Sequence, residues 1–129
     1  MSSFDGFHRE SHTRARGASA EAAGLAWLEG QGYEILATNY VTRAGEIDAV
    51  ARDGDTLCFV EIKARATSAF GPAVAAVDAR KQRKIVRAAG LYLAREGYEG
   101  PCRFDVLGLD PGPDGWAFTL LRDAFGANY

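Results

Sequence analysis

A helix-forming segment between two apolar strands is the feature that most restricts the fold of this chain. Residues 57–63 and residues 103–109 are rich in β-branched and aromatic side chains and predict strands. Between them, Asp78 can cap a helix that runs to about Arg95 and is followed by Gly97. A connection of this length permits the two strands to lie parallel in one sheet. The segment therefore predicts an α/β fold with a mixed sheet.

Other periodic segments extend this unit to the order α-β-β-β-α-β-β. They are a helix from about Ser19 to Gln31, strands at 33–40 and 45–52, and a last strand at 116–121. We expect a sheet of about five strands flanked by helices, forming one domain over residues 18–129. Residues 1–17 show no apolar period, and we expect them to form a flexible arm.

Charge and composition exclude some functions and favour others. The 129 residues include 15 Lys and Arg against 17 Asp and Glu, so the chain cannot coat nucleic acid through bulk positive charge. Residues 1–10 lack the apolar stretch of a signal peptide, and no run reaches the ~18 apolar residues of a membrane span. Cys58 and Cys102 lack metal-ligand or disulfide spacing and are expected in the core. We expect a cytoplasmic protein with no membrane partner.

A predicted hairpin brings two carboxylates together. Asp-Gly-Asp-Thr at residues 53–56 is a turn signal between two strands. If Arg52 faces Leu57, Asp48 lies opposite Glu61, whereas a regular three-residue loop would separate them. Carboxylates ~5 Å apart repel by about 3 kcal/mol at an effective dielectric near 20, so such a pair attracts a divalent cation. Oxygen ligands with open positions favour Mg²⁺ or Mn²⁺ over zinc.

Two further residues extend this candidate site. Lys63 projects on the same strand face as Glu61 and can hold an attacking water or neutralise charge on a phosphate, which suits phosphodiester hydrolysis. Glu21 falls on the core-facing side of the first helix, where an ionised group needs a cation or a donor. Two structural alternatives stay open. Glu21 can favour the helix dipole and lean into water, and Glu/Lys pairs also stabilise ordinary sheets.

The second predicted helix carries a basic face opposite its apolar one. That face suits contact with a phosphate backbone, although a solvated helix surface is the ordinary alternative. The candidate nucleic-acid-binding residues are Arg80, Lys81, Arg83, Lys84 and Arg87, with Arg43 and Arg65 as additions. Gln82 falls near the apolar side, so it is either a hydrogen-bonded core amide or a group that reaches the site.

A set of short motifs in a fixed order resembles a known family. The motifs are Gly45-Glu46-Ile47-Asp48, Phe59-Val60-Glu61-Ile62-Lys63-Ala64-Arg65, Phe70-Gly71, Lys81-Gln82 and Arg103-Phe104-Asp105-Val106. Over roughly residues 15–126 they resemble the signatures of the YraN-like uncharacterised bacterial family. That family in turn resembles the PD-(D/E)XK nucleases, especially archaeal Holliday junction resolvases.

The resemblance implies a restriction-endonuclease-like core and a role for each site residue. Asp48 and Glu61 would bind metal, and Lys63 would be the catalytic lysine. Glu21 would match the metal-binding carboxylate of the first helix, and Gln82 an auxiliary polar position of the second. The chain departs from the family pattern at two neighbours of these residues, since Ala stands at position 20, where Gly is frequent, and at position 64, where Thr is frequent. Neither change removes a catalytic group.

Two functions from different classes follow. The first is a Mg²⁺- or Mn²⁺-dependent endonuclease acting on branched or damaged DNA. The second is a catalytically silent DNA-binding or adaptor module in DNA repair. Intact Asp48, Glu61 and Lys63 favour the enzyme, because a binder needs no clustered acids beside phosphate. Resolvases of this fold often act as dimers because they cut two strands, so a homodimer is one assembly that the resemblance allows.

Overall fold

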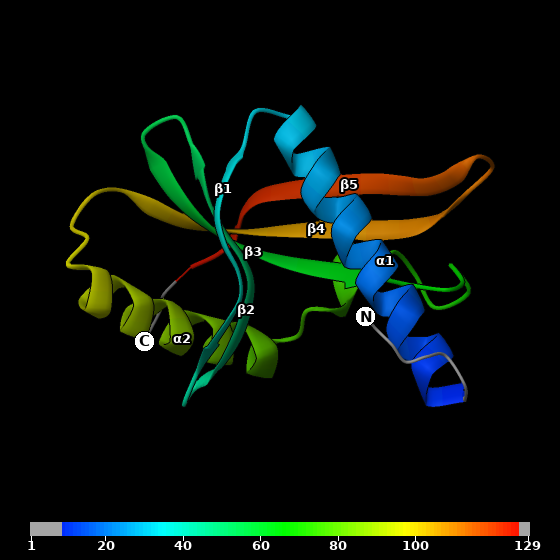
Figure 1. Cartoon of the computed structure of the whole chain (residues 1–129), viewed down its shortest axis with the longest axis horizontal. Helices are drawn as coiled ribbons and strands as arrows, with labels where there is room; N and C mark the ends of the chain where they lie inside the picture. Colours follow the sequence, from blue (N-terminus) through cyan, green and yellow to red (C-terminus); the bar gives the residue numbers. More distant parts are fainter. Residues whose placement is uncertain (1–8, 127–129) are drawn as a thin grey trace.

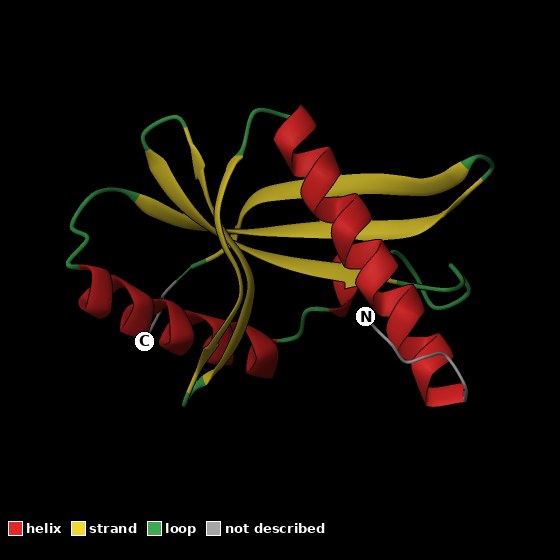
Figure 2. Ribbon diagram, viewed as in Figure 1, coloured by secondary structure: helices red, strands yellow, loops and turns green. Residues whose placement is uncertain are grey.

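A five-stranded mixed sheet with one helix on each face forms the core of the protein (Figures 1 and 2). This computed structural model describes residues 9–126, with side chains from residue 19 onward. In chain order the elements are α1 (Arg9–Gly30), β1 (Glu34–Thr42), β2 (Gly45–Asp53), β3 (Thr56–Ala64), the short 3-10 helix η1 (Ala73–Ala76), α2 (Ala79–Glu96), β4 (Cys102–Gly112) and β5 (Gly115–Phe125).

The strands lie in the sheet in chain order, from β1 at one edge to β5 at the other. Every neighbouring pair is antiparallel except β3 and β4, which are joined through α2. This is the parallel crossover that the long helical connection predicts. The α/β class and the mixed sheet of five strands flanked by helices are therefore confirmed, and this arrangement is consistent with a nuclease-like core. Both β4 and β5 extend beyond the predicted strand ends.

Small residues let α1 approach one face of the sheet closely. Ala20, Gly24 and Leu28 recur at every fourth position of α1 and are buried. A methyl group at Gly24 would lie 3.2 Å from side-chain carbons of Ile62 and Leu107, which would have to shift by a few tenths of an ångström to admit it. This contact holds the preceding turn of α1, which carries the predicted site residue Glu21, near the strands.

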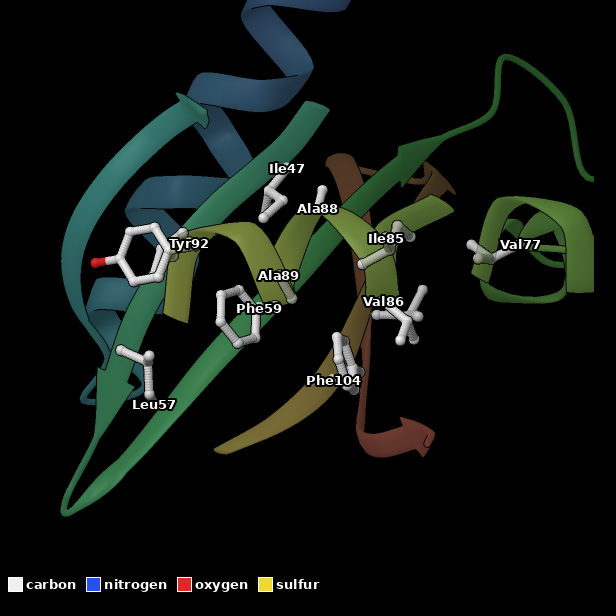
Figure 3. Close-up of a cluster of buried hydrophobic side chains, with 12 residues drawn as sticks. Ile47, Leu57, Phe59, Val77, Ile85, Val86, Ala88, Ala89, Tyr92 and Phe104 are labelled. Atoms are coloured by element: carbon white, nitrogen blue, oxygen red, sulfur yellow. The ribbon is translucent and has the colours of Figure 1, made fainter. Parts of the chain in front are cut away.

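Aromatic and aliphatic side chains fix α2 on the other face (Figure 3). Tyr92 of α2 meets Phe59 of β3 edge to face, with ring centroids 5.7 Å apart, and Phe59 stacks on Phe104 of β4. Ile85 and Ala89 are buried in the same cluster. Because this face of α2 is buried, the opposite face, with its predicted basic residues, is exposed.

The first helix begins at Arg9 rather than at the predicted Ser19, so it includes residues 9–17 of the expected flexible arm. Arg stands at positions 9, 14 and 16 of this segment, and together with Glu10 and Ala15 it favours a helix without an apolar period. Residues 1–8 of that arm lie outside the described part of the chain. Within the described residues, no helix combines the length and the apolar character needed to cross a membrane. Cys58 is buried as predicted, but the prediction is wrong for Cys102, which is exposed at the start of β4.

A buried ion network joins the end of α1 to β4 and β5. The carboxylate of Asp105 accepts hydrogen bonds from the Tyr33 hydroxyl at 2.7 Å, from Arg103 Nε at 2.9 Å and from the Asp123 backbone N–H at 2.9 Å. Arg103 also reaches Asp53, with Nη2 2.6 Å from Oδ2. Both carboxylate oxygens of Asp105 have donors. The structural role of this network therefore explains the motif Arg103-Phe104-Asp105-Val106.

Candidate functional site

The turn between β2 and β3 sets the register that brings the predicted carboxylates together. Arg52 pairs with Leu57, and the ladder continues to Ala49 and Val60, around a turn of two residues. The ladder ends there, one step short of Asp48 and Glu61, whose carboxyl groups lie close enough to repel each other and share a hydrogen bond.

Asp48 lies where β2 separates from β3. Its Oδ2 atom accepts a hydrogen bond from the backbone N–H of Ile62 at 2.8 Å, where the backbone ladder ends. Ile47 and Val50 both belong to the cluster under α2, although strict alternation would put them on opposite faces. The alternation of β2 therefore breaks at Asp48. Figure 1 shows β1 and β2 turning away from the direction of β3, β4 and β5.

The carboxylate of Glu61 is buried beside this acid. The residue is 6% exposed on β3. Burial, repulsion by Asp48 and a hydrogen bond shared with Asp48 raise the pKa of Glu61 to about 8, although Lys81 opposes the shift. A buried carboxyl with so perturbed a pKa, next to a second acid, is typical of a functional site.

The start of α2 supplies a cation that pairs with Glu61. Asp78 caps α2 by accepting a hydrogen bond from the backbone N–H of Lys81 at 2.9 Å. The Nζ atom of Lys81 then lies 3.5 Å from Oε2 of Glu61. Lys81 was predicted as a nucleic-acid contact, and its pairing with Glu61 was not anticipated.

Glu21 reaches the other side of the acidic pair through Asn39, a residue that the sequence analysis missed. Asn39 lies opposite Asp48, between the pairs Thr38–Ala49 and Tyr40–Ile47. With its amide oriented as its neighbours require, Nδ2 donates to Glu21 at 3.2 Å and to Glu46 at 2.7 Å. Burial raises the pKa of Glu21, Asn39 opposes the shift, and repulsion by Asp48 adds to it.

A backbone signal marks Asn39. Its φ angle is 50°, in the left-handed region that asparagine tolerates better than most residues. Asparagine is also depleted in strands, so its position within a predicted strand was the available sequence signal.

The remaining predicted residues divide between the site and its surroundings. Lys63 is exposed two positions after Glu61 on β3, and none of the ion pairs within residues 19–126 involves it. The side chain of Gln82 donates to the carbonyl of Val77 at 3.0 Å. Of the two alternatives left open for Gln82, the structure shows the hydrogen-bonded amide.

Two predicted basic residues outside α2 lie on loops. Arg43 is exposed in the turn between β1 and β2. A side chain at the neighbouring Gly45 would come within 3.8 Å of Cβ of Lys84, so this turn adjoins the basic face of α2. Arg65 follows β3, and its Nε atom is shielded from solvent with no hydrogen-bond partner in the described part of the chain.

The donor set fits a hard divalent ion with few protein ligands. Among the described residues, no three His, Cys, Asp or Glu side chains are grouped so that they could hold a metal ion. The pair Asp48 and Glu61 remains, with Glu21 hydrogen-bonded to Asn39 beside it. Mg²⁺ keeps several waters and is usually held by one or two carboxylates together with substrate phosphates. A two-carboxylate site is therefore adequate for Mg²⁺ or Mn²⁺.

The fold is an α/β arrangement consistent with a nuclease-like core, and a carboxylate pair lies where β2 and β3 diverge. The chain belongs to the uncharacterised protein family UPF0102, whose model matches residues 20–109. It is 47% identical to a UPF0102 protein of Symbiobacterium thermophilum over 89% of this chain and 99% of that protein. It is 45% identical to one of Cupriavidus necator over 98% of both chains. A third, from Pseudomonas putida, is 46% identical over 89% of this chain and 95% of its own.

Proposed function

We propose that this protein is a cytoplasmic, Mg²⁺- or Mn²⁺-dependent endonuclease that hydrolyses phosphodiester bonds in branched or damaged DNA. The observation that carries the proposal is the burial of the Glu61 carboxyl group directly beside the partly buried Asp48, since a buried acid next to a second acid is unfavourable without a cation. Asp48 and Glu61 would hold the ion. When bound, the ion would polarise the phosphate and lower the pKa of a water.

The chain's own residues would supply the rest of the chemistry. The hydrogen bond from Ile62 fixes one oxygen of Asp48, which keeps that carboxylate oriented toward the site. Lys63, on the same strand as Glu61, would neutralise the charge that builds on the phosphate during attack. Glu21 and Asn39 bound the site on the side of α1, where Glu21 would complete the ion's coordination through its water shell.

Positive charge at the start of α2 supports DNA as the substrate. No acidic residue lies in the first turn of α2, although acidic groups are favoured there by the helix dipole. Arg80, Lys81, Arg83 and Lys84 occupy that end instead. The N-terminus of a helix attracts anions, so these side chains and the backbone would act together on phosphates. Arg43 and Arg65 would extend the contact to either side.

A cleavage panel tests the proposal. Purified protein is incubated with Mg²⁺ or Mn²⁺ and with single-stranded, duplex, flapped and four-way-junction DNA. We expect cutting of at least one branched substrate, and we expect Lys63→Ala to lower the rate by roughly 100-fold or more, as general catalytic groups do. Arg95→Ala, which removes an exposed positive charge from the far end of α2, serves as the control and should cut like the wild type.

Two results would contradict the enzyme. One is the absence of cutting on every substrate with either ion, and the other is equal cutting by Lys63→Ala, which would indicate a contaminating nuclease. Circular dichroism of each variant establishes that the loss of cutting does not come from unfolding.

One observation favours a DNA-binding adaptor as the second candidate. Lys81 already gives Glu61 a counter-charge within the chain, so the acidic pair has a partner without any metal. An adaptor would bind DNA with a strong salt dependence and would bind no Mn²⁺. Calorimetry with Mn²⁺ and DNA-binding measurements at several salt concentrations separate the two functions.

A further inference from the structure

Lys81 occupies a helix position that normally carries the opposite charge. Asp78 is the N-cap of α2, which makes Lys81 the third helical residue. This is the position where a capping box places Glu or Gln, and where a cation is opposed by the helix dipole. The hydrogen bond from the Lys81 backbone N–H to Asp78 fixes the turn without help from the lysine side chain. The charge at this position is therefore not explained by the stability of α2.

The side chain of Lys81 instead points toward the carboxyl group of Glu61, beside Asp48. Its Nζ atom lies 3.5 Å from Oε2 of Glu61, and the lysine side chain is 49% exposed while that of Glu61 is 7% exposed. An ammonium group thus reaches from solvent to a buried acid. Because the lysine is half in water, it can leave that acid at little cost once another cation replaces it.

We propose that Lys81 is the counter-cation of Glu61 in the metal-free protein, and that it gives up this carboxylate to a divalent ion and turns to a phosphate of bound DNA. This inference rests on the proposed function, because it requires both the ion and the DNA. It assigns the two lysines of the site different roles. Lys63 acts on the reacting phosphate, whereas Lys81 competes with the ion for Glu61.

Competition predicts that the removal of Lys81 improves metal binding and impairs DNA binding. A lysine that only stabilised the site would, when removed, weaken both. Lys81→Gln keeps helix propensity and side-chain length while it removes the charge. Arg95→Gln changes the net charge of the same helix equally, at its other end, and controls for long-range electrostatics.

Calorimetric titration of Mn²⁺ into the full-length protein without DNA measures the first effect. We expect Lys81→Gln to bind Mn²⁺ about fivefold to tenfold more tightly than the wild type, as the loss of a competing charge a few Å away implies. Arg95→Gln should stay within about twofold of the wild type, because its charge lies beyond screening distance. Lys81→Arg retains the competing charge and should restore the wild-type affinity.

DNA binding measures the second effect, in a Lys63→Ala background so that the substrate stays intact. Without metal, the additional Lys81→Gln change should alter affinity for a four-way junction by less than about twofold, because Lys81 is held by Glu61. With Mn²⁺ the same change should weaken binding roughly threefold to tenfold, as the loss of one phosphate contact does.

Each outcome decides between the alternatives. Equal or weaker Mn²⁺ binding by Lys81→Gln, with clear binding by the wild type, would overturn the exchange while leaving the proposed endonuclease intact. Absence of Mn²⁺ binding by both proteins would overturn the exchange and the metal-dependent function together. Tighter Mn²⁺ binding without a metal-dependent loss of DNA affinity would overturn the transfer of Lys81 to phosphate.

Discussion

Two carboxylates are buried in the described part of the chain, and their surroundings are opposite. Asp105 has no exposed surface and accepts hydrogen bonds from Tyr33, Arg103 and a backbone N–H. Glu61 has a second carboxylate as its neighbour, and its cation, Lys81, is half-exposed and 3.5 Å away. The first acid has all its partners within the chain, and the second does not.

The surroundings of Asp105 and Glu61 distinguish an acid that supports the fold from an acid that is available to a ligand. Removing one partner of a buried, hydrogen-bonded charge is costly, because the other charge is then left uncompensated in the interior. A buried acid that faces another acid is unfavourable in the isolated chain and is relieved by an added cation. The Asp105 network therefore has a structural role, whereas the pair of Glu61 and Asp48 is the part of the sheet on which the proposed function depends.

The largest effect should come from matched substitutions of the two acids. Asp105→Asn leaves the guanidinium of Arg103 without its buried partner, and we expect the free energy of unfolding to fall by about 3 kcal/mol or more. Glu61→Gln removes the buried acid that faces Asp48 and should leave stability unchanged or higher. Urea denaturation of both variants at pH 7 makes the comparison. A larger loss for Glu61→Gln than for Asp105→Asn would reverse our assignment.

The pH dependence of stability should differ between the wild type and Glu61→Gln. The pKa of Glu61 is raised from 4.5 to about 8 in the folded protein, so between these values the folded state binds more protons than the unfolded state. Stability should therefore be highest below about pH 5 for this group and fall as pH rises to 8, by up to about 1.4 kcal/mol per pH unit. Denaturation from pH 5 to 8 without metal measures the slope. If the unfolding free energy of Glu61→Gln showed the same slope with pH, a group other than Glu61 would cause it.

The sequence was sufficient for the parts of the site that depend on local pattern. The two-residue turn determines which residues of β2 and β3 face each other, so the proximity of Asp48 to Glu61 could be predicted from the length of the turn. The exposed basic face of α2 followed from helical periodicity. Both predictions rest on contacts within one hairpin or one helix.

Features that depend on packing between elements could not be predicted in this way. The break of alternation at Asp48 arises because β2 turns toward α2, so that Ile47 reaches the same core as Val50. The approach of Lys81 to Glu61 depends on how closely α2 packs against the sheet. Two of the donors to Asp105, the Tyr33 hydroxyl and the backbone N–H of Asp123, come from other segments of the chain, which no periodicity connects to β4.

Two substitutions of Asn39 should differ in their effect on stability but not in their effect on DNA cutting. Its φ angle of 50° suits glycine but strains alanine, so Asn39→Ala should lose about 1 kcal/mol more stability than Asn39→Gly. Both variants remove the amide that holds Glu21 and should lower cutting similarly. Thermal denaturation and the cleavage assay are compared side by side. Wild-type cutting by Asn39→Gly would show that the amide does not position the site.

Gln82 should give the smallest effect. Its amide donates to the Val77 carbonyl, so Gln82→Ala should cost roughly 0.5–1.5 kcal/mol of unfolding free energy. We expect cutting to stay within about threefold of the wild type at temperatures where the variant is folded, a difference of less than about 1 kcal/mol in activation free energy. A greater loss in folded protein would assign Gln82 the auxiliary catalytic position that the family resemblance implies.

The most direct test of the account is the position of Mn²⁺ in crystals of the protein, located by its anomalous scattering. We predict one ion with oxygens of Asp48 and Glu61 both at about 2.0–2.6 Å, and with Lys81 withdrawn from Glu61. An ion bound elsewhere, or Glu61 still paired with Lys81 in saturating Mn²⁺, would contradict the claim that this carboxylate pair is a metal site.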